Sequence, residues 1–239
     1  MNPRIISAAT VLDARVAVIT GASGGIGAAT ARLLAARGAK VALLGRRKSL
    51  LDQQVAEISA AGGSAIAIAV DLTDQKAVDD AAKAVAAEFG IVNLVVNNAG
   101  IMLPAPVAEK RVADWEHMIS LNLMAAMRVI GSFVPSLLEA AADGCPSDLV
   151  NVSSIAAQNI YPNYAVYSAT RAATSHLSRH LRVELGAKDV RVCVVEPGAV
   201  GTGDGLEAED VAGTIAFAVG LPKHINLQQI TIMPTRQAT

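Results

Sequence analysis

The sequence predicts an α/β protein with a doubly wound parallel sheet and helices on both faces, giving three α/β/α layers. Short apolar runs alternate with Ala-rich stretches of helical periodicity over nearly the whole chain. The apolar runs lack polar alternation, which is typical of strands buried on both faces of a parallel sheet. Glycines follow several of the helical stretches, as expected at helix C-termini. Such repeated β-α alternation indicates this fold class.

Each element follows from this pattern. The predicted strands are Val16–Thr20, Lys40–Leu44, Ala65–Val70, Asn93–Asn97, Asp148–Val152, Val190–Val195 and Gln229–Met233. The predicted helices are Ile26–Arg37, Lys48–Ala61, Asp74–Phe89, Lys110–Ala142, Tyr164–Gly186 and a last helix that begins near Glu207. Without a linker or an internal repeat, we expect one domain at 14–239 after an N-terminal extension at 1–13.

Composition excludes several classes of protein. The 239 residues are 52% hydrophobic and carry a net charge of −1, which gives no electrostatic reason to bind nucleic acid or an anionic membrane. We see no secretory signal and no uninterrupted apolar run long enough to span a bilayer. Two cysteines are too few for a disulfide framework, and Cys193 lies in an apolar run as a buried side chain would. We therefore expect a cytoplasmic protein.

A glycine-rich loop joins the first strand to the first helix. It reads Thr20-Gly21-Ala22-Ser23-Gly24-Gly25-Ile26-Gly27, with glycines in the spacing G-x-x-x-G-x-G. Glycine is needed where the chain turns sharply, where the backbone touches a pyrophosphate and where helix packs on strand. The N-terminus of the helix then offers free N–H groups to phosphate. A glycine-rich turn without a ligand is the alternative, but the strand–turn–helix context favours a dinucleotide-binding Rossmann fold.

Charge predicts which dinucleotide binds. An NAD site usually has Asp or Glu after the second strand, where it binds the ribose 2′-hydroxyl. No acidic residue occurs between Ala14 and Leu51, and the second strand is followed by Arg46, Arg47 and Lys48. Guanidinium groups suit a 2′-phosphate in charge and geometry, so we expect NADP(H). Arg47 and Lys48 could instead serve only as solvated residues at the start of the next helix.

On these and further motifs, the chain resembles the short-chain dehydrogenase/reductase family from about Asp13 to its end. Asn97-Asn98-Ala99-Gly100, the pair Ser154 and Tyr167, and Pro197-Gly198 match the family in order. The ending Ile230–Arg236 looks like NADP-dependent members that act on small hydroxy acids, aldehydes and alcohols. The resemblance implies cofactor contacts by Gly21, Ser23, Gly25, Ile26, Gly27, Arg46, Arg47, Asp71, Leu72, Asn98, Ala99, Gly100, Tyr167, Arg171, Pro197, Gly198, Val200 and Thr202.

The resemblance also implies how a carbonyl would be reduced. Hydride comes from the nicotinamide, and a phenol can supply the proton when a nearby cation stabilises the phenolate. Tyr167 would be this acid/base, Ser154 would bind the substrate oxygen, and Asn122 would support a water-linked proton path. Packing, turn formation and a backbone contact are the alternative roles of these three residues. Tyr164 is not preferred, because it lies ten residues after Ser154 rather than thirteen.

Two positions depart from the family pattern. Arg171 stands where the family has a lysine that holds the nicotinamide ribose, and arginine is bulkier and planar. The segment after Thr202 has only four residues, Gly203–Leu206, before the next predicted helix, whereas relatives carry a long substrate lid there. The chain is therefore expected to be either an NADP(H)-dependent reductase with an exposed site or a dinucleotide-binding module with decayed catalysis, acting as a sensor or a partner subunit.

Two further expectations concern metals and partners. His176 and His180 lie four residues apart on a predicted helix, but two ligands alone do not indicate a metal site, so we expect no metal. The helix at Tyr164–Gly186 is apolar on more than one side and must bury the excess against the core or a partner. We expect a homo-oligomer, a tetramer or a dimer, paired through this helix and Lys110–Ala142.

Overall fold

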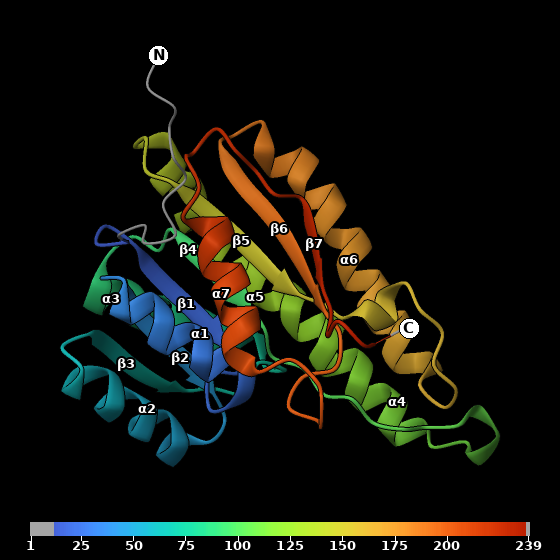
Figure 1. Cartoon of the computed structure of the whole chain (residues 1–239). Coiled ribbons are helices and arrows are strands. Elements are labelled where there is room, and N and C mark those ends of the chain that lie inside the picture. Colours follow the sequence, from blue (N-terminus) through green and yellow to red (C-terminus); the bar gives the residue numbers. More distant parts are fainter. Residues whose placement is uncertain (1–11, 238–239) are drawn as a thin grey trace.

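The computed structural model describes residues 12–237, so the predicted extension at 1–13 lies almost wholly outside the described residues. Seven parallel strands form one sheet in the order β3-β2-β1-β4-β5-β6-β7, as Figure 1 shows. The strands are β1 (Val16–Thr20), β2 (Lys40–Gly45), β3 (Ser64–Ala69), β4 (Leu94–Asn97), β5 (Ser147–Val152), β6 (Val190–Pro197) and β7 (Gln229–Ile232). The predicted doubly wound parallel sheet is confirmed.

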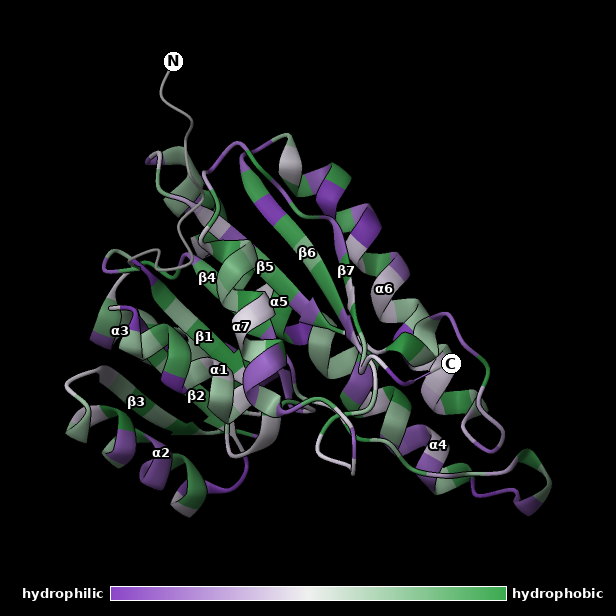
Figure 2. Ribbon diagram, in the orientation of Figure 1, coloured by the Kyte–Doolittle hydropathy of each residue, from purple (hydrophilic) through white to green (hydrophobic). Residues whose placement is uncertain are grey.

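Helices cover both faces of the sheet (Figure 1). One face packs against α1 (Gly25–Ala36), α2 (Lys48–Ala60) and α7 (Ala208–Val219), and the other against α3 (Gln75–Phe89), α5 (Ala125–Ala142) and α6 (Ala165–Gly186). Each strand from β1 to β6 therefore contributes alternate side chains to two separate cores, whereas β7 contributes to one. Figure 2 shows the result, since the central strands are mostly hydrophobic while the helices have mixed faces.

The predicted helix Lys110–Ala142 is wrong in its first part. The chain there forms a 3-10 turn (η1, Val107–Glu109), then α4 (Val112–Ile119), a π-helical turn (η2, Ser120–Met124) and α5. Lys110 ends the 3-10 turn with a φ of 51°, which breaks the helical path before α4. The π-helical turn inserts into an otherwise continuous helix, and apolar periodicity does not reveal such an insertion.

One helical stretch, Val112–Ala142, could cross a membrane by length and composition, with a mean hydropathy of 1.5. It contains charged residues, Asp114, Glu116, Arg128 and Glu139 among them, and is not an uninterrupted apolar run. Its apolar side chains Val129, Phe133 and Leu137 are fully buried against the sheet. In this structure one side of the stretch packs in the core of the domain.

Buried ion pairs connect the segments at the amino-terminal ends of the strands. Asp148 on β5 accepts hydrogen bonds from Arg15 Nη2 at 2.6 Å and from Arg191 Nη2 at 2.8 Å. Arg191 also donates to the carbonyls of Val219, the last residue of α7, and of Leu221, just after it. The carboxylate thus joins three segments at the edge opposite the carboxyl ends of the strands.

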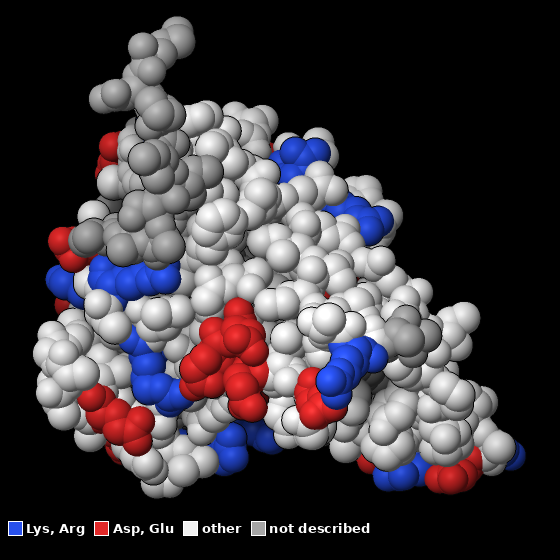
Figure 3. All heavy atoms as spheres, viewed as in Figure 1, with Lys and Arg blue, Asp and Glu red and all other residues white. Residues whose placement is uncertain are grey.

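On the molecular surface, Figure 3 shows that charges of both signs are interspersed on the face it draws.

Cys193 lies on β6 inside one of the two cores. Burial raises the pKa of its thiol to about 12, and the charge of Asp148 adds to the effect. The thiol therefore stays protonated and unreactive, as the apolar run around it predicts.

Candidate functional site

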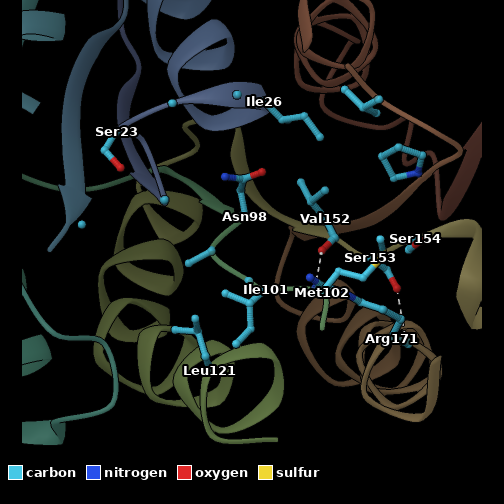
Figure 4. Close-up of a pocket in the computed structure, with 18 of the residues that line it drawn as sticks. Ser23, Ile26, Asn98, Ile101, Met102, Leu121, Val152, Ser153, Ser154 and Arg171 are labelled. Carbon is cyan, nitrogen blue, oxygen red and sulfur yellow. Dashed lines mark hydrogen bonds between the residues drawn. The ribbon is translucent and has the colours of Figure 1, made fainter. Parts of the chain in front are cut away.

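A cavity of about 1070 Å³ opens at the carboxyl ends of the strands (Figure 4). It spans the point between β1 and β4 where the strand order reverses, because successive strands are added on opposite sides of β1. In open α/β sheets ligands bind at this point. Every described strand except β7 contributes residues from its carboxyl end to the wall of the cavity.

The glycine-rich loop forms one side of the cavity. Gly21 and Gly25 have φ values of 68° and 52°, a region that residues with a side chain rarely adopt. The N-cap of α1, Gly24, has no side chain to bond the first N–H groups of the helix. Gly27 does not line the cavity; a Cβ there would lie 2.6 Å from the carbonyl oxygen of Gly21, so it permits the helix to pack on the turn. This arrangement leaves helix N–H groups available to an anion.

Thr20 ties this loop to the segment after β4. Its hydroxyl accepts hydrogen bonds from the N–H groups of Asn98 at 2.9 Å and Ala99 at 3.0 Å. The Asn98 amide returns a bond to the carbonyl of Thr20 at 2.9 Å. The two cavity walls therefore form one rigid unit at the switch point.

Basic side chains stand at the end of β2. Arg46 and Arg47 are exposed and both line the cavity. Arg47 donates to the Ser23 hydroxyl from Nη2 at 2.7 Å and from Nε at 3.2 Å, which brings its guanidinium onto the glycine-rich loop. Lys48 points elsewhere and pairs with Asp52 at 2.5 Å. Of the three cations, the structure brings the two arginines to the site.

Asp71 lies beside this cationic group, after β3. Hydrogen bonds from the N–H and hydroxyl of Thr73 hold the pKa of its carboxyl below the ordinary value, and the positive charge of Arg46 lowers it further. The carboxylate is therefore ionised at neutral pH. With Leu72, which the resemblance also gives as a cofactor contact, it forms part of the cavity wall.

The predicted acid/base group lies at the other end of the cavity. Tyr167 on α6 and Ser154 after β5 both line it. Tyr167 is only 8% exposed and packs edge-on against Tyr164, with ring centroids 6.5 Å apart. The Ser154 hydroxyl accepts a bond from the Ala156 N–H at 3.1 Å, so its own proton stays available to an oxygen in the cavity. A phenol and a hydroxyl thus meet at one end of a cavity whose other end holds arginines.

Arg171 points into the cavity wall (Figure 4). Its Nη1 donates to the carbonyl of Val152 at 3.4 Å, and its guanidinium carbon lies 5.1 Å from the centre of the Tyr167 ring. Gly100 makes room for it, since a Cβ there would lie 2.2 Å from Nη2. The buried Nε has no hydrogen-bond partner in the described chain. The guanidinium of Arg171 thus lies beside the Tyr167 ring, and its Nε–H donates no hydrogen bond to the described chain.

Asn122 does not line the cavity. It lies in the π-helical turn, where its side chain bonds both the N–H of Ile101 at 2.8 Å and the carbonyl of Ile101 at 2.9 Å. Its amide also donates to the Thr170 hydroxyl at 3.1 Å. The sequence allowed a contact with a neighbouring backbone as the alternative role of Asn122, and these hydrogen bonds are such a contact. They hold the segment after Gly100 against α6.

The segment after Thr202 is a closed turn rather than a lid. The N–H of Gly201 donates a hydrogen bond to the carbonyl of Leu206 at 2.8 Å. The next helix, α7, begins at Ala208, close to the start near Glu207 that the sequence predicts. The C-terminal segment lies across this turn: Gln237 accepts a bond from the Ala199 N–H at 2.8 Å, and Arg236 pairs with Asp204 at 3.5 Å. This side of the cavity is therefore built from short segments.

Most residues predicted from the sequence come together at this cavity. All of the predicted cofactor residues except Gly27 line it, as do Ser154, Tyr167 and Arg171, while Asn122 lies behind the wall. Their chemical roles stay predictions. The sequence analysis missed the lining residues Gly24, Gly45, Val70, Ile101, Met102, Leu121, Val152, Ser153 and Ala199. Most of these residues are next to a predicted residue in the sequence, so their position beside a motif was the one feature of the sequence that could have identified them as lining residues.

The cavity fits a dinucleotide phosphate. Uncapped helix N–H groups face it, side-chain-free loop positions allow close backbone approach, and two guanidinium groups stand where a second phosphate would lie. The chemistry of these donors suits an extended, anionic ligand.

Comparison with known proteins agrees with this geometry. The model of the short chain dehydrogenase family matches residues 15–209. An uncharacterized oxidoreductase of Staphylococcus aureus (strain USA300) is 34% identical over 235 residues, covering 94% of this chain and 99% of that protein.

Solved structures agree as well. A metagenomic short-chain oxidoreductase in complex with NADP is 33% identical, with a TM-score of 0.86 and coverage of 97% and 100% of the two chains. A 3-ketoacyl-(acyl-carrier-protein) reductase from Brucella melitensis complexed with NADH is 28% identical, with a TM-score of 0.87 and coverage of 94% and 99%. The chain therefore belongs to the short-chain dehydrogenase/reductase family and is an oxidoreductase of that family.

Proposed function

We propose that this protein is an NADP(H)-dependent oxidoreductase, formed by one domain at 14–239, that interconverts a small carbonyl compound and its alcohol. The substrate would be an aldehyde, a ketone or a hydroxy acid. One observation carries the proposal: the glycine-rich loop with its arginines and the group Ser154, Tyr167 and Arg171 line the same cavity. Phosphate recognition at one end would thus direct the nicotinamide end towards the phenol.

The roles of the residues follow from their positions. A bound nicotinamide dinucleotide would supply or accept the hydride. Tyr167 would give its phenolic proton to the substrate oxygen during reduction and take it back during oxidation. Ser154 would donate its hydroxyl hydrogen to that same oxygen and orient it. Arg171, beside the Tyr167 ring, would favour the phenolate by its charge.

The preference for NADP(H) rests on the end of β2. Arg46 and Arg47 line the cavity there, and Arg47 is already held on the glycine-rich loop through Ser23. A 2′-phosphate placed between them would receive charge-assisted hydrogen bonds. The alternative function, a dinucleotide-binding module with decayed catalysis, is favoured by Arg171 and the short turn after Thr202, and it predicts NADPH binding without turnover.

We also propose a cytoplasmic homo-oligomer, a tetramer or a dimer, paired through α5 and α6. Ala165, Ala169 and Ala172 on α6 are exposed, and Val183 is 67% exposed. On α5, Met127 is 44% exposed. Two helices with small and apolar residues on their outer sides are suited to close packing against a second copy.

Replacing Tyr167 by Phe tests the catalytic role. We expect NADPH oxidation over a panel of small aldehydes, ketones and diketones to be abolished, because the proton donor is lost, while NADPH still binds. The matched control is Tyr164→Phe, which removes a hydroxyl from the adjacent ring and is expected to keep activity. Full activity of Tyr167→Phe would refute the assignment, and binding without turnover in the natural protein would favour the decayed module.

Replacing Arg171 by Lys is expected to raise turnover at least severalfold, by about 1 kcal/mol of transition-state stabilisation or more. An ammonium concentrates its charge and its donors on one atom, whereas the guanidinium spreads them beside the ring and leaves Nε unbonded. Steady-state kcat on the most reactive substrate is the measurement. Unchanged or lower turnover would mean that arginine is the adapted residue here.

Arg46→Ala and Arg47→Ala are each expected to weaken NADPH binding by about ten- to hundredfold and to leave NADH binding almost unchanged. Lys48→Ala is the control, because this neighbouring cation does not line the cavity and is expected to bind NADPH normally. Calorimetric titration with both cofactors gives the values. Equal losses for NADPH and NADH would show that the arginines are structural.

Light scattering at micromolar concentration is expected to give the mass of a tetramer or a dimer. Ala169→Glu should shift the mass towards the monomer, since it buries a charge in the proposed interface. Ala56→Glu, at an exposed position of α2, is the matched control and should leave the mass unchanged. A monomeric mass for the natural protein would disprove the pairing.

A further inference from the structure

The side chain of Gln237 connects two segments that lie far apart in the sequence. Its Oε1 accepts a hydrogen bond from the N–H of Ala199 at 2.8 Å, and its Nε2 donates one to the hydroxyl of Tyr161 at 3.4 Å. Ala199 follows β6 and lines the cavity, whereas Tyr161 lies between Ser154 and α6. Gln237 thus forms a bridge between the segment 197–200 and the segment 155–164.

Both ends of this bridge lie near the end of the cavity that holds Tyr167. The ring of Tyr161 packs in the apolar cluster that contains Tyr167 and Tyr164. The segment 197–200 lines the cavity together with Ser154 and Tyr167, because β5 and β6 are neighbours and both segments follow their carboxyl ends. The bridge therefore limits how far the two segments can separate at this end.

The fold holds Gln237 in place for these contacts. β7 runs beside β6 at the edge of the sheet (Figure 1), and the N–H of Gly198 donates to the carbonyl of Ile232 at 2.8 Å. The N–H of Gln237 then closes a tight turn onto the carbonyl of Pro234 at 3.0 Å, and Pro234 is buried. Gly198 leaves room for the amide, since a Cβ there would collide with Gln237 Oε1.

The neighbouring ion pair contributes less to this attachment. Arg236 and Asp204 lie 3.5 Å apart, and their side chains are 85% and 84% exposed. Exposed ion pairs are screened by water and salt and stabilise little. Gln237 is half-buried, so water competes less for its hydrogen bonds.

We propose that Gln237 is a positioning residue that holds the segments 197–200 and 155–164 together and so restricts the size of the carbonyl compound that reaches Tyr167. The inference rests on the proposed oxidoreductase function, to which it adds a determinant of substrate size. Gln237 does not line the cavity and acts through the two segments that it joins. Such a contact affects the rate, because a misplacement of about 1 Å costs about a hundredfold.

Hydrogen–deuterium exchange of the free protein tests the bridge without cofactor or substrate. In Gln237→Ala we expect peptides that contain Ala199 and Tyr161 to exchange about three- to tenfold faster, because a side-chain hydrogen bond is lost. Gln237→Glu has the same length and can accept from both the N–H of Ala199 and the hydroxyl of Tyr161, so it should keep the protection. Arg236→Ala removes only the exposed ion pair and is the matched control. Unchanged exchange at Ala199 in Gln237→Ala would overturn the proposal.

Steady-state kinetics test the effect on substrate size. For Gln237→Ala we expect kcat/KM for a small aldehyde to fall about three- to tenfold, and kcat/KM for a bulky aryl ketone to fall less or to rise. NADPH binding should stay nearly unchanged, since Arg46 and the glycine-rich loop lie at the other end of the cavity. Gln237→Glu should behave like the natural protein.

A general loss of stability would lower kcat/KM for both substrates alike, so equal losses in Gln237→Ala would refute the role in substrate size. Absence of turnover by the natural protein would refute the proposed function instead. In that case the exchange measurement decides by itself whether Gln237 holds the two segments together.

Discussion

The carboxylate of Glu196 is the contact on which the end of the cavity that holds Tyr167 and Arg171 depends. It is fully buried at the end of β6 and forms no ion pair with any described residue. Its oxygens instead accept from Ser175 at 2.6 Å, Gln229 at 2.8 Å and the amide of Gln158. These donors come from α6, β7 and the segment after Ser154. A buried charge keeps such donors in place, because losing any of them leaves it under-solvated.

This contact fixes the position of α6 relative to the strand ends. Ser175 is also bonded to Ser153, whose hydroxyl reaches the carbonyl of Arg171 at 2.9 Å. Residues 167, 171 and 175 follow one another at successive turns of the helix, so holding Ser175 also sets the two side chains that face the cavity. The orientation of Tyr167 thus depends on a polar network beneath it, and not on packing alone.

The fit of Arg171 depends on a residue from another part of the fold. Its guanidinium lies against Gly100, where any Cβ would clash, and Asn122 holds the neighbouring Ile101 backbone from the π-helical turn. Three segments distant in sequence therefore shape the space around one cation. Beside Thr202 the C-terminal segment lies across the closed turn, through the contacts of Arg236 and Gln237.

The sequence alone determined the parallel sheet and the glycine-rich loop, because buried strands, helix ends and loop glycines each leave a local pattern. The family resemblance of its motifs supplied most of the other residues that line the cavity. It could not determine the break before α4 or the π-helical turn, since apolar periodicity continues through both. Nor could it determine the position of Asn122, the space beside Gly100 or the bridge that Gln237 forms between Ala199 and Tyr161. Those depend on distances between residues and on side-chain orientation, which only the packed tertiary structure decides.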